Sequence, residues 1–152
     1  RETTESRGLG DVYKRQVLYS DYEKFVVADI PGIIEGASTG VGLGTQFLKH
    51  ISRTKMLLNI IDGSNKTYEM ITAEIEKIHR ELETYDETLI KKDLWVVINK
   101  IDLVSNEELN DLKNKFNMTK LIVYFVSTVN KIGIEELTDN IYEFLKYENR
   151  IK

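Results

Sequence analysis

The stretch "LWVVINKID", residues 94–102, decides how this chain folds, because an unbroken apolar run changes abruptly into polar residues. Its first five residues are all apolar and do not alternate with polar ones, which predicts a strand buried on both faces of a parallel sheet. In open parallel sheets, ligands bind beyond the carboxyl ends of the strands. The segment from Asn99 to Asp102 is therefore expected to lie at a binding site.

Similar apolar runs recur along the chain and alternate with amphipathic helical patterns. Further strands, also buried on both faces, are expected at Phe25–Ala28, Met56–Ile61 and Leu121–Val126. Apolar residues at helical spacing predict helices within residues 43–51, 71–85 and 134–144, and the Ser105/Glu108 pair predicts a capping box at the start of a further helix. This order predicts an α/β fold in which helices cover both faces of a mostly parallel sheet, giving three layers.

Composition excludes several classes of function. The chain has 152 residues, of which 41% are hydrophobic, which fits one globular domain. It contains no cysteine, and its two histidines, His50 and His79, lie far apart, so a zinc site is not expected. A net charge of −4 argues against direct DNA readout. No apolar run suggests a membrane span or a signal peptide, and a cytoplasmic location is expected.

Three of the four predicted strands end in polar segments that could form one site. The segments are Asp29-Ile30-Pro31-Gly32, Asn99-Lys100-Ile101-Asp102 and Ser127-Thr128-Val129. Any one of them alone is explained by ordinary turn chemistry and solvation. Their occurrence together, each after a buried strand, favours a shared ligand site.

In this order, the DxxG, NKxD and Ser-led segments resemble the G3, G4 and G5 motifs of GTPases. The stretch "DIPGIIEGASTGVGLGTQFLKHISRT", residues 29–54, resembles the Obg family in particular. The resemblance runs from about residue 17 to about residue 147. It implies a P-loop NTPase-type, Rossmann-like fold in a domain that binds and hydrolyses GTP, with GTP, GDP and the ribosome as partners and Mg²⁺ as cofactor.

Base recognition is expected at Asp102, whose carboxylate can accept hydrogen bonds from the ring N–H and the exocyclic amine of guanine, a donor pair that adenine lacks. The resemblance implies that Asn99 ties this loop to neighbouring backbone and that the stem of Lys100 covers the base, although a lone lysine here is equally explained as a solvated surface residue. It also implies that backbone N–H groups of residues 127–129 face guanine O6, where the family usually has Ser-Ala and this chain has Ser127-Thr128. The predicted GTP-binding residues are Asp29, Ile30, Pro31, Gly32, Asn99, Lys100, Ile101, Asp102, Ser127, Thr128 and Val129.

By the same resemblance, Asp29 holds Mg²⁺ through water and the Gly32 N–H meets the γ-phosphate. The glycines that follow suit a switch II segment that is ordered by the γ-phosphate: Gly36, Gly40, Gly42 and Gly44. Many related GTPases place a glutamine after the DxxG glycine to orient water, whereas this chain has Ile33. Intrinsic hydrolysis is therefore expected to be slow, and no catalytic residue is assigned.

The chain departs from the family because no lysine directly follows a glycine, so the GxxxxGK[ST] P-loop is missing. The first strand and switch I are expected to be missing with it, since Thr3 and Thr4 have the wrong spacing to Asp29 to supply the switch I threonine. Residues 1–16 are interpreted as a leader that is foreign or unstructured, and residues 17–152 as the C-terminal portion of a partial Obg-type G domain. Without its P-loop, this polypeptide is expected to be inactive.

Two other functions remain open from the sequence. The chain could be an interaction module that binds a protein or the ribosome without a nucleotide. It could also be another Rossmann-like enzyme, although the glycine spacing does not form GxGxxG at a first strand–helix turn and no further acid–base constellation is present. The resemblance implies that the parent protein is a GTPase, and it does not decide whether this chain by itself is an enzyme.

Overall fold

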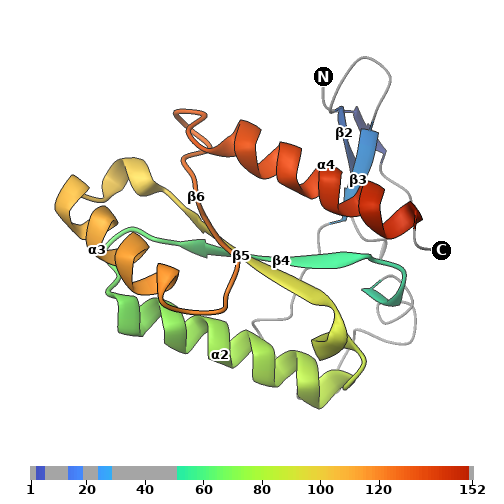
Figure 1. Ribbon diagram of the computed structural model, residues 1–152, viewed down its shortest axis with the longest axis horizontal. Coiled ribbons are helices and arrows are strands. Elements are labelled where there is room, and N and C mark those ends of the chain that lie inside the picture. The colour runs from blue at the N-terminus through green and yellow to red at the C-terminus, as the bar shows by residue number, and fades with distance from the viewer. Residues whose placement is uncertain (1–2, 6–13, 19–23, 29–50, 151–152) are drawn as a thin grey trace. The chain divides into compact units, whose positions relative to one another are not determined.

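The computed structural model describes residues 3–5, 14–18, 24–28 and 51–150 (Figure 1). The chain divides into two units, one made of Arg1–Thr54 with Thr138–Lys152 and the other of Lys55–Leu137. Each unit is described by itself. The second unit contains two of the three predicted site segments, those from Asn99 and from Ser127.

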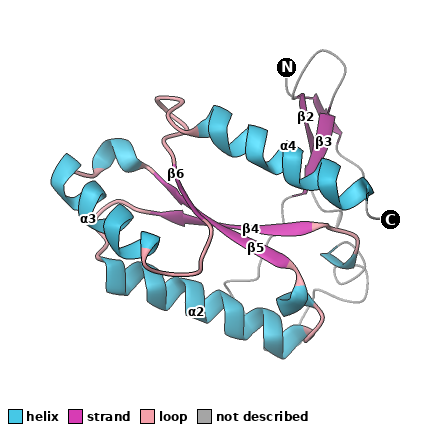
Figure 2. Ribbon diagram, viewed as in Figure 1, coloured by secondary structure: helices cyan, strands magenta, loops and turns pink. Residues whose placement is uncertain are grey.

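A parallel sheet forms the centre of the second unit. Its strands lie in the order β4 (Met56–Asp62), β5 (Asp93–Asn99) and β6 (Val123–Phe125). Helix α2 (Tyr68–Tyr85) connects β4 to β5, and α3 (Asn106–Asn117) connects β5 to β6 (Figure 2). Helix α4 (Ile134–Arg150) begins in this unit after β6, and from Thr138 onward it belongs to the first unit. Short 3-10 helices lie at Leu89–Lys91 and Ile101–Leu103. The predicted α/β fold with a parallel sheet is confirmed.

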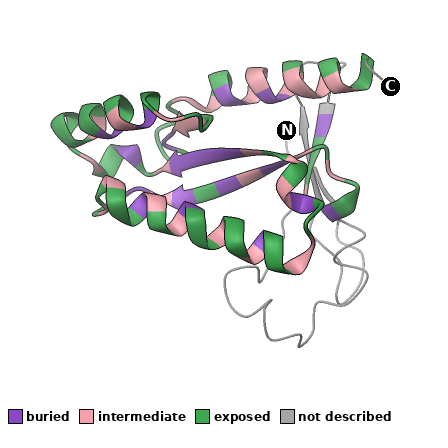
Figure 3. Ribbon diagram, turned by 60° about the horizontal axis from the view of Figure 1, so that its bottom comes forward, coloured by how far each residue is buried: buried purple, intermediate pink, exposed green. Residues whose placement is uncertain are grey.

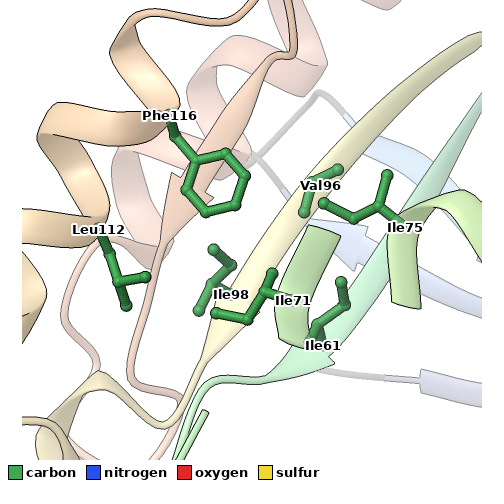
Figure 4. Packing of buried hydrophobic residues seen from close by; sticks show 7 residues of the cluster. All are labelled: Ile61, Ile71, Ile75, Val96, Ile98, Leu112 and Phe116. Atoms are coloured by element: carbon green, nitrogen blue, oxygen red, sulfur yellow. The ribbon is translucent and has the colours of Figure 1, made fainter. Parts of the chain in front are cut away.

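The core of this unit lies between the sheet and helices α2 and α3 (Figure 4). Its buried members come from β4, β5 and these two helices: Ile61, Ile71, Ile75, Val96, Ile98, Leu112 and Phe116. On the opposite face of β5, Trp95 and Val97 are also buried, and Trp95 stacks on Tyr124 with ring centroids 5.4 Å apart. The prediction that β5 is buried on both faces is therefore confirmed, and the burial can be followed in Figure 3.

The helices begin where local side-chain hydrogen bonds satisfy their first N–H groups. At α3, the Glu108 N–H donates to Ser105 Oγ at 3.3 Å, and the Ser105 N–H donates to Glu108 Oε2 at 3.2 Å. This confirms the predicted capping box. At α2, Thr67 Oγ1 accepts a hydrogen bond from the Met70 N–H at 3.3 Å, an N-cap that the apolar spacing alone did not predict.

The prediction that the other strands are buried on both faces was wrong. Val26 in β3 is 54% exposed and Ile60 in β4 is 63% exposed. Leu121 and Ile122 are exposed and precede the short β6 rather than belonging to it. In the described sheets β3, β4 and β6 are outer strands, and an outer strand does not need to bury both faces.

The first unit contains an antiparallel sheet in the order β1 (Thr3–Glu5), β2 (Lys14–Leu18) and β3 (Lys24–Ala28). Residues 3–5 and 14–16, which belong to the predicted leader, take part in this sheet. The interpretation of residues 1–16 as foreign to the domain stays a prediction. The helix predicted from residue 43 lies outside the described residues, except for its buried last member, Ile51.

Two adjacent residues of α2 test the account of the core. Ile71 is fully buried, whereas its neighbour Met70 is 49% exposed. Replacing Ile71 with alanine is expected to lower the free energy of unfolding by about 2–5 kcal/mol, because it leaves a cavity under the sheet. Met70→Ala is the matched control, with an expected change within about 0.5 kcal/mol. Urea unfolding of both variants measures the difference, and equal losses would contradict the assigned helix face.

Candidate functional site

The ends of β5 and β6 meet at one edge of the sheet because the two strands are parallel neighbours. Beyond the strand pairs, the Val126 N–H donates to the Ile98 carbonyl oxygen at 2.8 Å, and the Ile101 N–H donates to the Val126 carbonyl oxygen at 3.2 Å. These bonds extend the pairing into the polar loops. The segments from Asn99 to Asp102 and from Ser127 to Val129, which lie about 25 residues apart along the chain, are thereby brought side by side.

Asp102 and Ser127 form the most direct side-chain contact between the two loops. The Ser127 hydroxyl donates to Asp102 Oδ1 at 2.6 Å, and Ser127 is completely buried. The serine is fixed in turn, since its hydroxyl oxygen accepts from the Asn130 N–H at 3.2 Å and its backbone exchanges two hydrogen bonds with Ile132, each 3.0 Å long. Asp102 itself is exposed. Its carboxylate is therefore held from the protein side while further acceptor positions face outward.

Asn99 ties the same two loops together through its amide group. Its Oδ1 accepts from the Lys100 N–H at 2.8 Å and from the Thr128 N–H at 3.2 Å, and its Nδ2 donates to Thr128 Oγ1 at 3.4 Å. Thr128 thus adds a hydroxyl acceptor for Asn99. The Thr128 N–H is already engaged, so it would have to share or leave Asn99 to meet a guanine O6.

Lys100 follows β5 in the left-handed backbone region, with φ of 64°, and its side chain reaches the end of β4. Its Nζ lies 2.6 Å from Asp62 Oδ2. Hydrogen bonds from Lys100 and then from Ser64 hold the pKa of Asp62 well below the ordinary value. Asp62 is not among the site residues predicted from the sequence, although it stands directly after the apolar run Met56–Ile61, the same signal that identified the other strand ends.

Gly133 closes the loop that carries Ser127, and it too is absent from the residues predicted from the sequence. Its φ is 71°, and a Cβ at this position would lie 2.6 Å from the Phe125 carbonyl oxygen. A side chain is therefore excluded for both conformational and steric reasons. The glycine lets the chain turn back at Ile132 to make the two backbone bonds that fix Ser127.

The predicted phosphate and metal residues lie outside the described residues. These are Asp29, Ile30, Pro31 and Gly32, together with Ile33 and the four switch II glycines. Of the seven remaining predicted residues, Asn99 contacts Thr128 and Asp102 contacts Ser127. Lys100 pairs with Asp62 instead, Ile101 is buried, and Val129 is 79% exposed. In the part of the chain that the structure describes, no cluster of three or more His, Cys, Asp or Glu side chains could hold a metal ion. No helix in that part is long and apolar enough to cross a bilayer.

Comparison with solved structures defines the class of fold. The crystal structure of nucleolar GTP-binding protein 1 from Plasmodium falciparum matches with a TM-score of 0.52 and 19% sequence identity, covering 91% of this chain and 72% of that one. At this identity the match shows the fold alone. The fold class is that of the P-loop NTPases, as the sequence predicts.

Comparison of sequences then identifies the family. Residues 3–100 match the profile of the family described as 50S ribosome-binding GTPase, and the chain belongs to that family. It is 44% identical over 131 residues to GTPase Obg of Buchnera aphidicola subsp. Baizongia pistaciae (strain Bp), covering 84% of this chain and 38% of that protein. It is 40% identical over 126 residues to GTPase Obg of Lachnoclostridium phytofermentans, covering 80% of this chain and 29% of that protein. The resemblance to Obg proteins is confirmed, and this chain spans less than two-fifths of their length.

The lowered pKa of Asp62 predicts how its ion pair responds to acid. Because folding lowers this pKa below its ordinary 3.8, the stabilisation, which is small for an ion pair whose partners are about half exposed, is fully present above about pH 4 and is lost as pH falls through the lower folded value. The difference in urea midpoint between the unsubstituted chain and Asp62→Asn should therefore shrink between about pH 5 and about pH 2.5. A difference that stays constant over this range would show that the Asp62 charge does not contribute. Asp86→Asn is a second case rather than a control, because hydrogen bonds from the Thr88 N–H, at 2.8 Å, and then from the Thr88 hydroxyl hold the pKa of Asp86 below its ordinary value as well.

Proposed function

We propose that this chain forms the guanine-reading part of the GTP-binding switch domain of an Obg-type GTPase. The observation that carries the proposal is the Asp102 carboxylate, which is exposed toward solvent yet held by the buried Ser127 hydroxyl at 2.6 Å. Family membership supports the same assignment.

The chemistry of the carboxylate suits guanine. An ionised carboxylate has about four acceptor positions, and Ser127 uses one of them. Two others can accept from guanine N1–H and from its exocyclic amine. Adenine has no N–H at N1 and no amine at C2, so its binding would leave these acceptors unpaired, and a desolvated unpaired acceptor costs about 1–3 kcal/mol or more when it is charged. Asp102 therefore favours guanine over adenine without any contact to phosphate.

The neighbouring contacts support Asp102 as the base reader. Asn99 joins the Asp102 loop to Thr128, which limits the relative movement of the two loops. Lys100 is half exposed beside them, so the apolar stem of its side chain is available to cover a planar base. Rigid placement of polar groups lowers the entropy that is lost on binding, and this favours recognition of a small ligand.

The further properties that family membership suggests are proposals for the whole protein. We infer hydrolysis of GTP to GDP, Mg²⁺ held through water by Asp29, and association with the ribosome, the last supported by the family description. When bound, Mg²⁺ would neutralise charge that develops on the phosphates. The cytoplasmic location stays a prediction.

Base selectivity tests the role of Asp102. In xanthine a carbonyl replaces the exocyclic amine of guanine, so an amide that both donates and accepts should match it better than a carboxylate. Asp102→Asn is therefore expected to lose binding of GDP at least tenfold and to gain binding of xanthosine diphosphate. The measurement is a titration of the ¹⁵N-labelled chain with millimolar nucleotide, followed by amide chemical shifts.

The control for this experiment is Asp111→Asn, which changes an exposed aspartate on α3 that pairs with Lys115 and not with the two loops. It is expected to leave both affinities unchanged. If Asp102→Asn kept the GDP affinity of the unsubstituted chain, Asp102 would not read the base. A different outcome is also informative. If the chain showed no guanine selectivity and bound its partners equally well with and without nucleotide, it would be a nucleotide-independent interaction module.

Hydrolysis tests the consequence of the missing P-loop sequence. Each charge-assisted hydrogen bond to phosphate contributes about 1.5–3 kcal/mol, so the loss of several lowers affinity by several powers of ten. The 152-residue polypeptide is expected to bind GTP with Mg²⁺ only in the millimolar range and to release no phosphate above the buffer rate. Calorimetric titration and a phosphate-release assay measure the two quantities. Micromolar binding or measurable turnover would mean that another segment grips the phosphates.

A further inference from the structure

The ends of β4 and β5 are joined by an ion pair that the proposed base recognition does not require. In the register of these strands Asp62 is paired with Asn99. Lys100 therefore lies one residue further along the sheet edge than Asp62. The Lys100 ammonium reaches back across this edge to Asp62 Oδ2 at 2.6 Å. The contact links the end of β4, which carries no predicted site residue, to the NKxD loop.

Asp62 is itself held in a defined orientation. Its Oδ1 accepts from the Ser64 N–H at 2.9 Å and from the Ser64 hydroxyl at 2.5 Å. The intervening Gly63 donates its N–H to the Asn99 carbonyl oxygen at 2.9 Å, and a Cβ on this glycine would lie only 2.6 Å from Ile98 Cγ2. The loop after β4 therefore packs directly against the end of β5, and both carboxylate oxygens of Asp62 are committed.

Lys100 is held at both of its ends. Its backbone adopts the left-handed region, which is unfavourable for a lysine, and its N–H is bound by Asn99 Oδ1 at 2.8 Å. At the other end the ammonium is bound by Asp62. Backbone conformations of this kind persist where surrounding contacts impose them, and they occur often at functional sites. The four-carbon stem between the two anchors thus has a defined course while remaining half exposed.

We propose that Asp62 is a positioning residue for nucleotide binding, which acts by holding the Lys100 stem in the place where it covers the guanine base. This inference rests on the proposed function and adds to it a residue from a third strand end. Because both partners of the ion pair are about half exposed, the pair adds little to folding stability. Its larger effect is to order a flexible side chain before the base arrives, so that less conformational entropy is lost on binding.

The test is a double-mutant cycle on the full 152-residue chain. GDP affinity is measured by amide chemical shifts at millimolar nucleotide for the unsubstituted chain, Asp62→Asn, Lys100→Met and the double variant. Asp62→Asn is expected to weaken binding about three- to tenfold, the range expected when one long side chain must be ordered on binding. In the Lys100→Met background the same change should have no further effect, because Asp62 acts through the lysine. A loss that is undiminished in that background, or no loss in Asp62→Asn, would overturn the inference.

Two further variants separate positioning from a general structural effect. Asp62→Glu keeps the charge and should restore most of the affinity. Ser64→Ala removes only the hydroxyl that orients Asp62, so it should weaken binding less than Asp62→Asn does and should also have no effect with Lys100→Met. If Asp62→Asn fails to fold, Ser64→Ala replaces it in the double-mutant cycle with Lys100→Met. The matched control is Asp86→Asn, an aspartate held by its own local turn through Thr88 at the other end of α2, which should bind GDP like the unsubstituted chain.

Comparison with inosine diphosphate, which lacks the exocyclic amine, separates this inference from the proposed function. The ratio of GDP to inosine diphosphate affinity should be the same in Asp62→Asn as in the unsubstituted chain, since the Lys100 stem covers the base and does not read its amine. If the ratio fell in Asp62→Asn, Asp62 would act through Asp102. That result would overturn the role assigned to Asp62 but not the proposed function. An unsubstituted chain that shows no preference for guanine would contradict the proposed function itself, and the inference with it.

Discussion

The structure of the site depends on the parallel pairing of β5 with β6 and its continuation past both strand ends. The Val126 N–H and the Val126 carbonyl oxygen are bonded to Ile98 and Ile101, one residue on each side of the Asn99–Lys100 pair. This register fixes which side chains of the two loops meet. A slip of one residue would turn the side chains of β6 to the opposite face and separate Ser127 from Asp102. Base recognition as proposed here is therefore a consequence of strand register.

The core and the site place opposite demands on the same strands. Val96 and Ile98 are fully buried beneath α2 and α3, which fixes the position of β5. Directly after Ile98 the chain becomes polar, and the completely buried Ser127 is satisfied through its hydroxyl, its N–H and its carbonyl oxygen, all of which are hydrogen-bonded. The apolar part supplies stability, and the polar part orients an exposed carboxylate. The proposed function depends on the few residues at which the apolar strand changes into the polar loop.

Sequence patterns predicted the elements that depend on local chemistry. The β5 run, the apolar face of α2 and the Ser105 capping box were all correct, because each is determined by the spacing of neighbouring residues. Burial of β3 and β4 was predicted wrongly, since exposure of Val26 and Ile60 depends on the place of a strand in its sheet. Asp62 was missed for a related reason: its partner Lys100 is 38 residues away, and only strand register brings them together. The structural need for glycine at position 133 becomes evident only from the turn that brings Ile132 back to Ser127.

The central claim is that Asp102 reads guanine while Ser127 holds it, and the most direct test is a structure of the chain with guanosine monophosphate bound. The account predicts that N1 and the exocyclic nitrogen of the base each lie within about 3.2 Å of an Asp102 carboxylate oxygen. It also predicts that the Ser127 hydroxyl keeps its contact with Oδ1, now 2.6 Å, and that the Lys100 stem lies against one face of the base. A base bound away from Asp102, or bound only after the Ser127 contact breaks, would contradict the account.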